Sequence, residues 1–264
     1  MKNKYYLLSL VWVSFLFSQH AIGNDSFFNE TDKFLGEYVK HGKVNYQSVS
    51  SHPKALNNLV KQIENYSLEG KTKQQEKAFW INAYNILVIK GIIEHYPVQS
   101  PMKIPGFFDA KKHLAAGQKL TLNQIENKKI RAVYHDARIH FVLVCAAVSC
   151  PPITNFAYKP GNLDDQLEQQ TIKALNDDKF IRVNQENQSV GISEIFKWYA
   201  EDFKTNGKGF IEYINLYRKE KIPPGYKVEF YSYDWSLNEI KTPQARQEVQ
   251  NEIEPKKKTS SCRT

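Results

Sequence analysis

The sequence predicts a single helix-rich α+β domain with a small β-sheet around a buried central helix. Residues 73–96 form a long helical segment, and their middle, residues 78–93, is apolar on nearly every face, which is typical of a helix enclosed by a core. Short strands are predicted at residues 180–183, 189–192 and 227–233. Neither repeats nor a linker divide the body, so these elements belong to one domain.

Residues 1–23 have the organisation of a signal peptide. Two lysines precede an apolar run, residues 5–17, and small residues follow at the expected cleavage positions. The run is short for a membrane span, and an uncleaved anchor is the alternative. We therefore expect an exported protein, periplasmic or secreted, with its folded domain over residues 24–240, no stable membrane span after cleavage, and a disordered charged tail over residues 241–264.

The net charge of +8 resides largely at the chain ends. The body retains only about +2, because the leader and residues 255–264 contain no acidic side chain. A basic end of this kind is typical of a solvated tail and is not evidence of a basic binding face, so we expect no nucleic-acid partner. The basic residues at the two ends are Lys2, Lys4, Lys256, Lys257, Lys258 and Arg263.

The remaining elements follow from apolar spacing and capping residues. Residues 99–117, with several prolines and glycines, are predicted to form a loop long enough to cover a cleft. Thr121 and Gln124 have the form of a capping box at the start of a helix that reaches about Tyr134. Two of the predicted strands form a hairpin. Further helices are predicted over residues 25–40, 53–66, 162–176, 194–203 and 210–217.

Residues 138–152, RIHFVLVCAAVSCPP, contain two of the three cysteines and the strongest strand pattern. Alternation over residues 139–145 places Cys145 on one face, in the core, and His140 on the other. Cys150 follows the strand and precedes two prolines, at a turn where a thiol can meet a ligand. A cysteine nucleophile needs a lowered thiol pKa, for which a nearby histidine is one source.

Extended geometry argues against a direct contact between His140 and Cys150. A strand from His140 to Ala146 would carry the chain about 20 Å, and the four steps from Ala146 to Cys150 could bring it back by at most about 14 Å. The two meet only if the strand is shorter or strongly bent; otherwise the base is His113 or His135. A Cys145–Cys150 disulfide is the competing expectation, since export favours oxidation. Because neither CxxC nor HExxH spacing is present, we predict no metal and no cofactor.

Three polar positions outside this stretch each have two interpretations. Asn82 and Asn85 lie on one face of the central helix. They either bond to the backbone of neighbouring loops or orient a catalytic group or ligand. Glu126, one turn into its helix, is either exposed to solvent or part of a site.

Several motifs in order resemble the DUF547 family, a domain of unknown function: FWINAYN, the Ile125–Glu126 pair, RIHFVLVCAAVSCPP, SEIFKWYAEDF and YDWSLN. The resemblance covers roughly residues 43–238. Its members include exported bacterial proteins and eukaryotic proteins that join the domain to other modules. Asn127 stands where the resemblance implies a histidine. The matching positions are Asn82, Glu126, His140, Cys145, Ser149, Cys150 and Asp202.

Two hypotheses about function follow. In the first, the protein is a thiol-dependent hydrolase or acyl-transfer enzyme of the cell envelope, with Cys150 as nucleophile, His140 as base, and Glu126 or Asn82 orienting the imidazole. In the second, it is a non-enzymatic domain that binds an unknown envelope ligand or peptide, and its cysteines and histidine are structural. The C-x4-C spacing differs from that of C-x-x-C redox proteins. The residues expected to bind substrate are Asn82, Ser149 and Asp202, and the oligomeric state is not predicted.

Overall fold

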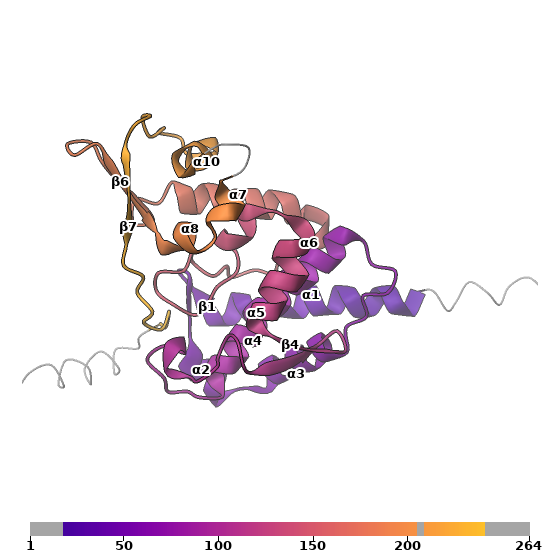
Figure 1. Ribbon diagram of the computed structural model, residues 1–264. Coiled ribbons are helices and arrows are strands. Elements are labelled where there is room, and N and C mark those ends of the chain that lie inside the picture. The colour runs from indigo at the N-terminus through magenta and orange to yellow at the C-terminus, as the bar shows by residue number, and fades with distance from the viewer. Residues whose placement is uncertain (1–17, 205–208, 241–264) are drawn as a thin grey trace, which may run out of the picture.

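Helix α4 (Lys73–Ile93) is the element around which the others pack. The computed structural model describes residues 18–204 and 209–240, with side chains from Ser26 onward (Figure 1). Thr72 Oγ1 accepts a hydrogen bond from the Gln75 backbone N–H at 3.2 Å and starts α4 with a capping box. Residues 77–89 are all buried, so the predicted central helix is confirmed.

The predicted chain ends fall mainly outside the described residues. Residues 18–23 of the expected leader lie in the first helix, while residues 1–17 and the expected tail over residues 241–264 are not described. Among the helices that are described, none is both long enough and apolar enough to cross a membrane.

The N-terminal elements pack against α4 and support residues 138–152, which we call the central stretch. A turn at Gly42, which has a φ of +74°, lies so close to Pro152 that a Cβ on the glycine would be 2.3 Å from the proline Cβ. This contact holds the end of residues 138–152 in place. The helices predicted near residues 25–40 and 53–66 are confirmed. The elements are α1 (Ser18–Tyr38), β1 (Val39–Lys40), β2 (Lys43–Val44), α2 (Tyr46–Ser51) and α3 (Lys54–Glu64).

The segment predicted as one loop over residues 99–117 also contains part of a hairpin. After the short helix η1 (Pro101–Lys103), strand β3 (Lys112–Ala115) pairs antiparallel with β4 (Gln118–Thr121). The turn between the strands uses Ala116 and Gly117 at positive φ, 47° and 71°. A two-residue turn with both φ angles positive suits the twist of a hairpin, but alanine is a weak signal for it, and the sequence therefore predicted a loop.

A π-helix follows β4. The Thr121–Gln124 capping box is confirmed, and it starts α5 (Leu122–Gln124), which continues as the π-helix η2 (Ile125–Arg131) and then as α6 (Ala132–Tyr134). Because a π-helix bonds residues five apart, Glu126 and Arg131 lie on the same side of it.

The strand predicted at residues 139–145 is wrong. The chain forms a 3-10 helix, η3 (Ala137–Phe141), and then continues in irregular backbone to Cys150. The side chain of Asn85 takes the place of a neighbouring strand. Its Nδ2 donates to the Val142 carbonyl at 2.9 Å, and its Oδ1 accepts from the Val144 N–H at 2.9 Å. The buried Val142 carbonyl and Val144 N–H therefore have a hydrogen-bond partner although no neighbouring strand is present.

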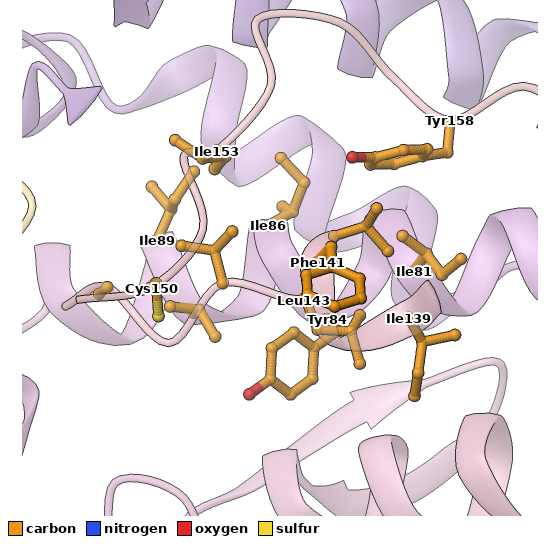
Figure 2. Close-up of a cluster of buried hydrophobic side chains, with 14 of the residues drawn as sticks. Ile81, Tyr84, Ile86, Ile89, Ile139, Phe141, Leu143, Cys150, Ile153 and Tyr158 are labelled. Carbon is orange, nitrogen blue, oxygen red and sulfur yellow. The ribbon is translucent and has the colours of Figure 1, made fainter. Parts of the chain in front are cut away.

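The central stretch is buried on most sides, which explains why its apolar pattern was misleading. Figure 2 shows side chains of this stretch packed against side chains of α4 in one cluster. A run that is apolar all round is compatible with a buried strand, a helix or irregular backbone, and periodicity cannot separate these. The labelled residues are Ile81, Tyr84, Ile86, Ile89, Ile139, Phe141, Leu143, Cys150, Ile153 and Tyr158.

The C-terminal half supplies a three-stranded sheet and short helices, gathered at one end of the molecule (Figure 1). Strand β6 pairs antiparallel with β5, as the predicted hairpin requires, and parallel with β7. The helix predicted over residues 194–203 breaks into two at Tyr199. The elements are η4 (Pro160–Asn162), α7 (Leu163–Leu175), β5 (Ile181–Asn184), β6 (Ser189–Ser193), α8 (Glu194–Trp198), α9 (Ala200–Phe203), α10 (Phe210–Tyr217) and β7 (Lys227–Tyr231).

The segment after β7 returns across the molecule to the central stretch. The Val148 N–H donates to the Ser236 carbonyl at 2.8 Å, and the Asn238 N–H donates to the Ala146 carbonyl at 3.0 Å. These bonds bring the aromatic residues of the YDWS motif beside the two cysteines. About half of the residues that the structure describes are helical and the sheets are small, which confirms the predicted α+β fold.

Candidate functional site

One cavity of about 480 Å³ is lined by the three residues predicted to be catalytic, Cys150, His140 and Glu126. The segment over residues 101–109 lies along it, as expected for a loop that covers a cleft. Helix α4, the π-helix, the central stretch and the segments around α8 and β7 supply the other walls. The side chains that line the cavity include Tyr84, Phe108, Glu126, His140, Cys145, Cys150, Trp198, Tyr199, Tyr233 and Trp235.

Cys145 and Cys150 are joined in a disulfide that lines the cavity, with their Cα atoms 6.5 Å apart. The chain turns between the two cysteines. Ala146 has a φ of 63°, and the Cys150 N–H donates a hydrogen bond to the Ala147 carbonyl. Burial differs from the prediction. Cys145, expected in the core, is only half-buried, whereas Cys150, expected at an open turn, is 9% exposed. The difference follows from the missing strand, which would have alternated the side chains.

Two hydrogen-bond donors approach the sulfur of Cys150. The Tyr233 hydroxyl lies 3.0 Å from Cys150 Sγ, and the Cys145 backbone N–H donates to the same atom at 3.0 Å. The Tyr233 hydroxyl also lies 3.2 Å from Cys145 Sγ. The polar groups around Cys150 Sγ are therefore a hydroxyl and a backbone N–H, both within hydrogen-bond distance of the sulfur.

His140 is buried in the cavity wall and is held by a chain of charged groups. Its Nε2 lies 2.6 Å from Asp202 Oδ2, and Arg131 Nε donates to the same oxygen at 2.7 Å. Burial alone would raise the pKa of Asp202, but the hydrogen bonds from His140 and Arg131 outweigh it and hold that pKa far below its usual range. The imidazole also packs on Tyr199, with ring centroids 4.1 Å apart. Asp202, expected to bind substrate, thus contacts the histidine.

The π-helix positions a second acidic group in the cavity. Glu126 is 7% exposed, so it is part of the site's wall and does not face open solvent. The Tyr84 hydroxyl donates to Glu126 Oε2 at 3.3 Å, and burial together with Glu126 raises the pKa of Tyr199 above its ordinary value. Asn127, at the position where the resemblance implies a histidine, accepts a hydrogen bond from Arg131 and so supports the ion pair with Asp202.

Two residues predicted to bind substrate make contacts elsewhere. Asn82 donates to the Tyr158 carbonyl at 2.8 Å and accepts from the Tyr158 N–H at 3.0 Å, which fastens the following loop to α4. Ser149 Oγ accepts from the Asp234 N–H at 2.8 Å. Neither side chain is among those that line the cavity.

The alternative bases suggested by sequence do not line the cavity either. His113 lies in β3, where burial and then the charge of Lys111 lower its pKa to about 4. His135 ends α6 in the left-handed region, at a φ of 46°. Across the described residues, we find no group of three or more histidine, cysteine, aspartate or glutamate side chains that could hold a metal ion.

An aromatic wall, formed by Trp198, Tyr233, Trp235 and Phe108, was not recognised from the sequence. The rings of Trp198 and Trp235 stack with centroids 5.8 Å apart, and Tyr233 lies 4.7 Å from Trp235. The KWY and YDW triplets were visible as aromatic motifs. Only the return of the chain after β7 shows that they share a wall.

The fold and the site define a single α+β domain whose cavity combines a disulfide, a histidine–aspartate pair, a buried glutamate and an aromatic wall. In the comparison with known proteins, residues 68–173 match the family model described as "Protein of unknown function, DUF547", which supports the family resemblance of the sequence motifs. Curated proteins and solved structures give no significant match. The matched segment includes Glu126, His140 and both cavity cysteines, whereas Asp202 and most of the aromatic wall lie beyond it.

Proposed function

We propose that the protein is an exported, thiol-dependent hydrolase or acyl-transfer enzyme of the cell envelope, active when the Cys145–Cys150 disulfide is reduced. The observation that carries this proposal is the pair of donors aimed at Cys150 Sγ in the cavity that His140 also lines. A ligand pocket alone has no need of such donors or of an oriented imidazole. The leader-like pattern of residues 1–23 supports export.

The proposed chemistry begins when a dithiol reductant of the envelope opens the disulfide. The reductant is oxidised to its own disulfide, and Cys145 and Cys150 become thiols. His140 takes the proton of Cys150, and the thiolate attacks the carbonyl carbon of an amide or ester. The bond to the leaving group breaks as the imidazolium returns the proton to it, and a thioester remains. Water or a second nucleophile then attacks the thioester and releases the thiol.

Asp202 and Arg131 act as positioning residues in this scheme. Asp202 accepts from His140 and stabilises the imidazolium, while Arg131 fixes the carboxylate. Tyr233 and the Cys145 N–H, which contact Cys150 Sγ, hold the thiolate before attack.

The test is alkylation of the reduced protein by iodoacetamide at pH 6, with peptide mass spectrometry to separate Cys150 from Cys145 and Cys262. An ordinary thiol is only about 0.3% ionised at pH 6, so a stabilised Cys150 thiolate should react at least about tenfold faster than that level allows. The variant Asp202→Asn should slow this reaction, and p-nitrophenyl acetate should acetylate Cys150 selectively. Alkylation of Cys150 at the rate of an ordinary thiol overturns the proposal.

A non-enzymatic ligand-binding domain is the second candidate, and the disulfide itself favours it. Two joined sulfurs have no free thiol, so the cavity would then act only as a pocket with structural cysteines. The same mass spectrometry, performed on the folded protein with and without a mild dithiol reductant, distinguishes the candidates. A disulfide that resists mild dithiol reductants in the folded protein supports the binding domain.

A further inference from the structure

Glu126 presents a buried carboxylate without an ionic partner. Its side chain is 7% exposed, and in the described parts of the chain it makes no ion pair with lysine, arginine or histidine within 4.0 Å. Its hydrogen-bond partners are the hydroxyls of Tyr84 and Tyr199, and the charge of Arg131, which is paired with Asp202, acts on it only from beyond 4.0 Å. A buried carboxylate is costly unless it is paired, and hydroxyl donors satisfy its hydrogen bonds without neutralising its charge.

The aromatic wall lines the same cavity as Glu126. Trp198 is 46% exposed although its ring stacks on Trp235, and Tyr233 lies 4.9 Å from Trp198. Indole and phenol faces carry partial negative charge and attract cations. An aromatic wall also binds uncharged apolar rings. The carboxylate of Glu126 therefore decides between a cationic and an apolar ligand, because only a cation pairs with it.

We propose that this cavity binds an organic cation, an ammonium group carried on a short aliphatic chain, between Glu126 and the aromatic wall. A neutral ligand would leave the carboxylate unpaired, and an anion would be repelled by it. The volume of about 480 Å³ lies in the range of small-ligand sites and accommodates a lysine-sized group. The ligand is either a free alkylamine or a basic side chain of a peptide, and the chemistry that recognises it is the same.

The cation subsite lies next to the cysteines. Glu126, Tyr233 and Cys150 line the same cavity, and the Tyr233 hydroxyl lies 3.0 Å from Cys150 Sγ. Burial, Tyr231 and Glu126 together raise the pKa of Tyr233, so this hydroxyl remains a donor. An ammonium group held by Glu126 would therefore place its own chain beside the sulfur. The substrate attacked by the Cys150 thiolate would then carry a basic group near the bond that is cleaved. This consequence deepens the proposed function and rests on it.

Calorimetric titration of the oxidised protein tests the subsite without involving a thiol. The probes are butylammonium chloride, butan-1-ol and sodium butyrate, which share one chain and differ in charge. We expect saturable binding of butylammonium, about tenfold or more weaker binding of butanol, and no binding of butyrate. Acetyl-Ala-Lys-Ala-amide and its norleucine counterpart then distinguish a peptide side chain from a free amine. Equal binding of butanol and butylammonium, or no binding of butylammonium, overturns the inference.

Two variants assign the binding to the proposed residues. Glu126→Gln removes the charge and keeps an acceptor for the tyrosine hydroxyls, and we expect it to weaken butylammonium binding about tenfold. Asp165→Asn removes the same charge from the exposed face of α7 and should leave binding unchanged. Should Glu126→Gln fail to fold, Trp198→Leu, at a half-exposed position, must weaken binding instead. Because no thiol takes part, unreactive cysteines would contradict the proposed enzyme while leaving this subsite intact.

Discussion

Arg131 and Asp202 form a two-point ion pair, with Nε 2.7 Å from Oδ2 and Nη2 3.0 Å from Oδ1. The shared oxygen Oδ2 also lies 2.6 Å from His140 Nε2. The three residues come from the π-helix η2, the helix α9 and the 3-10 helix η3. Because bidentate pairing fixes the plane of the carboxylate, the orientation of the imidazole depends on the π-helix that places Arg131.

The variant Asp202→Asn should lower the free energy of unfolding at pH 7 by about 2 kcal/mol, since it removes charge-assisted hydrogen bonds to both His140 and Arg131. The pKa of Asp202 is lowered in the folded state, so the stabilisation is fully present above its ordinary pKa of about 4 and is lost as the pH falls further. Urea unfolding of wild type and variant at pH 7 and pH 3 measures this. The difference between the two proteins should shrink at pH 3, and an unchanged difference would contradict the assignment.

Asn85 should be among the most sensitive positions of the fold. Replacing it with leucine leaves the Val142 carbonyl and the Val144 N–H buried without their partner, and we expect a loss of about 2–4 kcal/mol in the free energy of unfolding. Denaturant titration measures the loss. Asn57→Ala is the matched control, because the Asn57 side chain accepts a single 3.3 Å hydrogen bond at the surface, and it should change stability by less than about 0.5 kcal/mol. Equal losses in the two variants would show that the central stretch does not depend on this amide.

The contacts of Asn85 show why the central stretch was predicted wrongly, whereas several helices were predicted correctly. Helix α4 could be predicted because its apolar run is long and bounded by a capping residue, and α10 (Phe210–Tyr217) because its apolar spacing is helical. Residues 139–145 are mostly apolar, and the Val142 carbonyl and the Val144 N–H find their partner in Asn85, a contact between positions far apart in sequence. No local pattern reports such a contact, so the strand was predicted and is absent.

Only part of the candidate site could be selected from the sequence, and its arrangement could not. Cys150, His140 and Glu126 were selected from sequence and line one cavity. The burial of Glu126 and the position of Arg131 depend on the π-helix, whose five-residue hydrogen bonding is not visible in a pattern with helical spacing.

His113 should make the fold less stable in mild acid. Burial and the charge of Lys111 lower its pKa to about 4, and its Nε2 has no hydrogen-bond partner in the described structure. The unfolded chain takes up a proton below about pH 6.5, whereas the folded protein does so only near pH 4. Stability is therefore lost as the pH falls through this window, by on the order of 2 kcal/mol.

Urea unfolding of wild type and His113→Gln between pH 7.5 and pH 4.5 isolates the effect, since glutamine is neutral throughout. The wild type should lose more stability over this range than the variant. Parallel pH profiles would mean that other groups account for the acid sensitivity.

Reduction of the disulfide should loosen the central stretch without unfolding the protein. A bridge over so short a loop constrains the unfolded chain by about 2 kcal/mol, so reduction should lower the free energy of unfolding by about that amount. The loop retains its hydrogen bonds from the Val148 N–H to Ser236 and from the Ser149 N–H to Asp234, which do not involve sulfur. Urea unfolding with and without a dithiol reductant measures the change. The double variant Cys145→Ser/Cys150→Ser should match the reduced protein in stability and still bind butylammonium. A reduced protein that is unfolded at 25 °C would rule out the dithiol form as the enzyme.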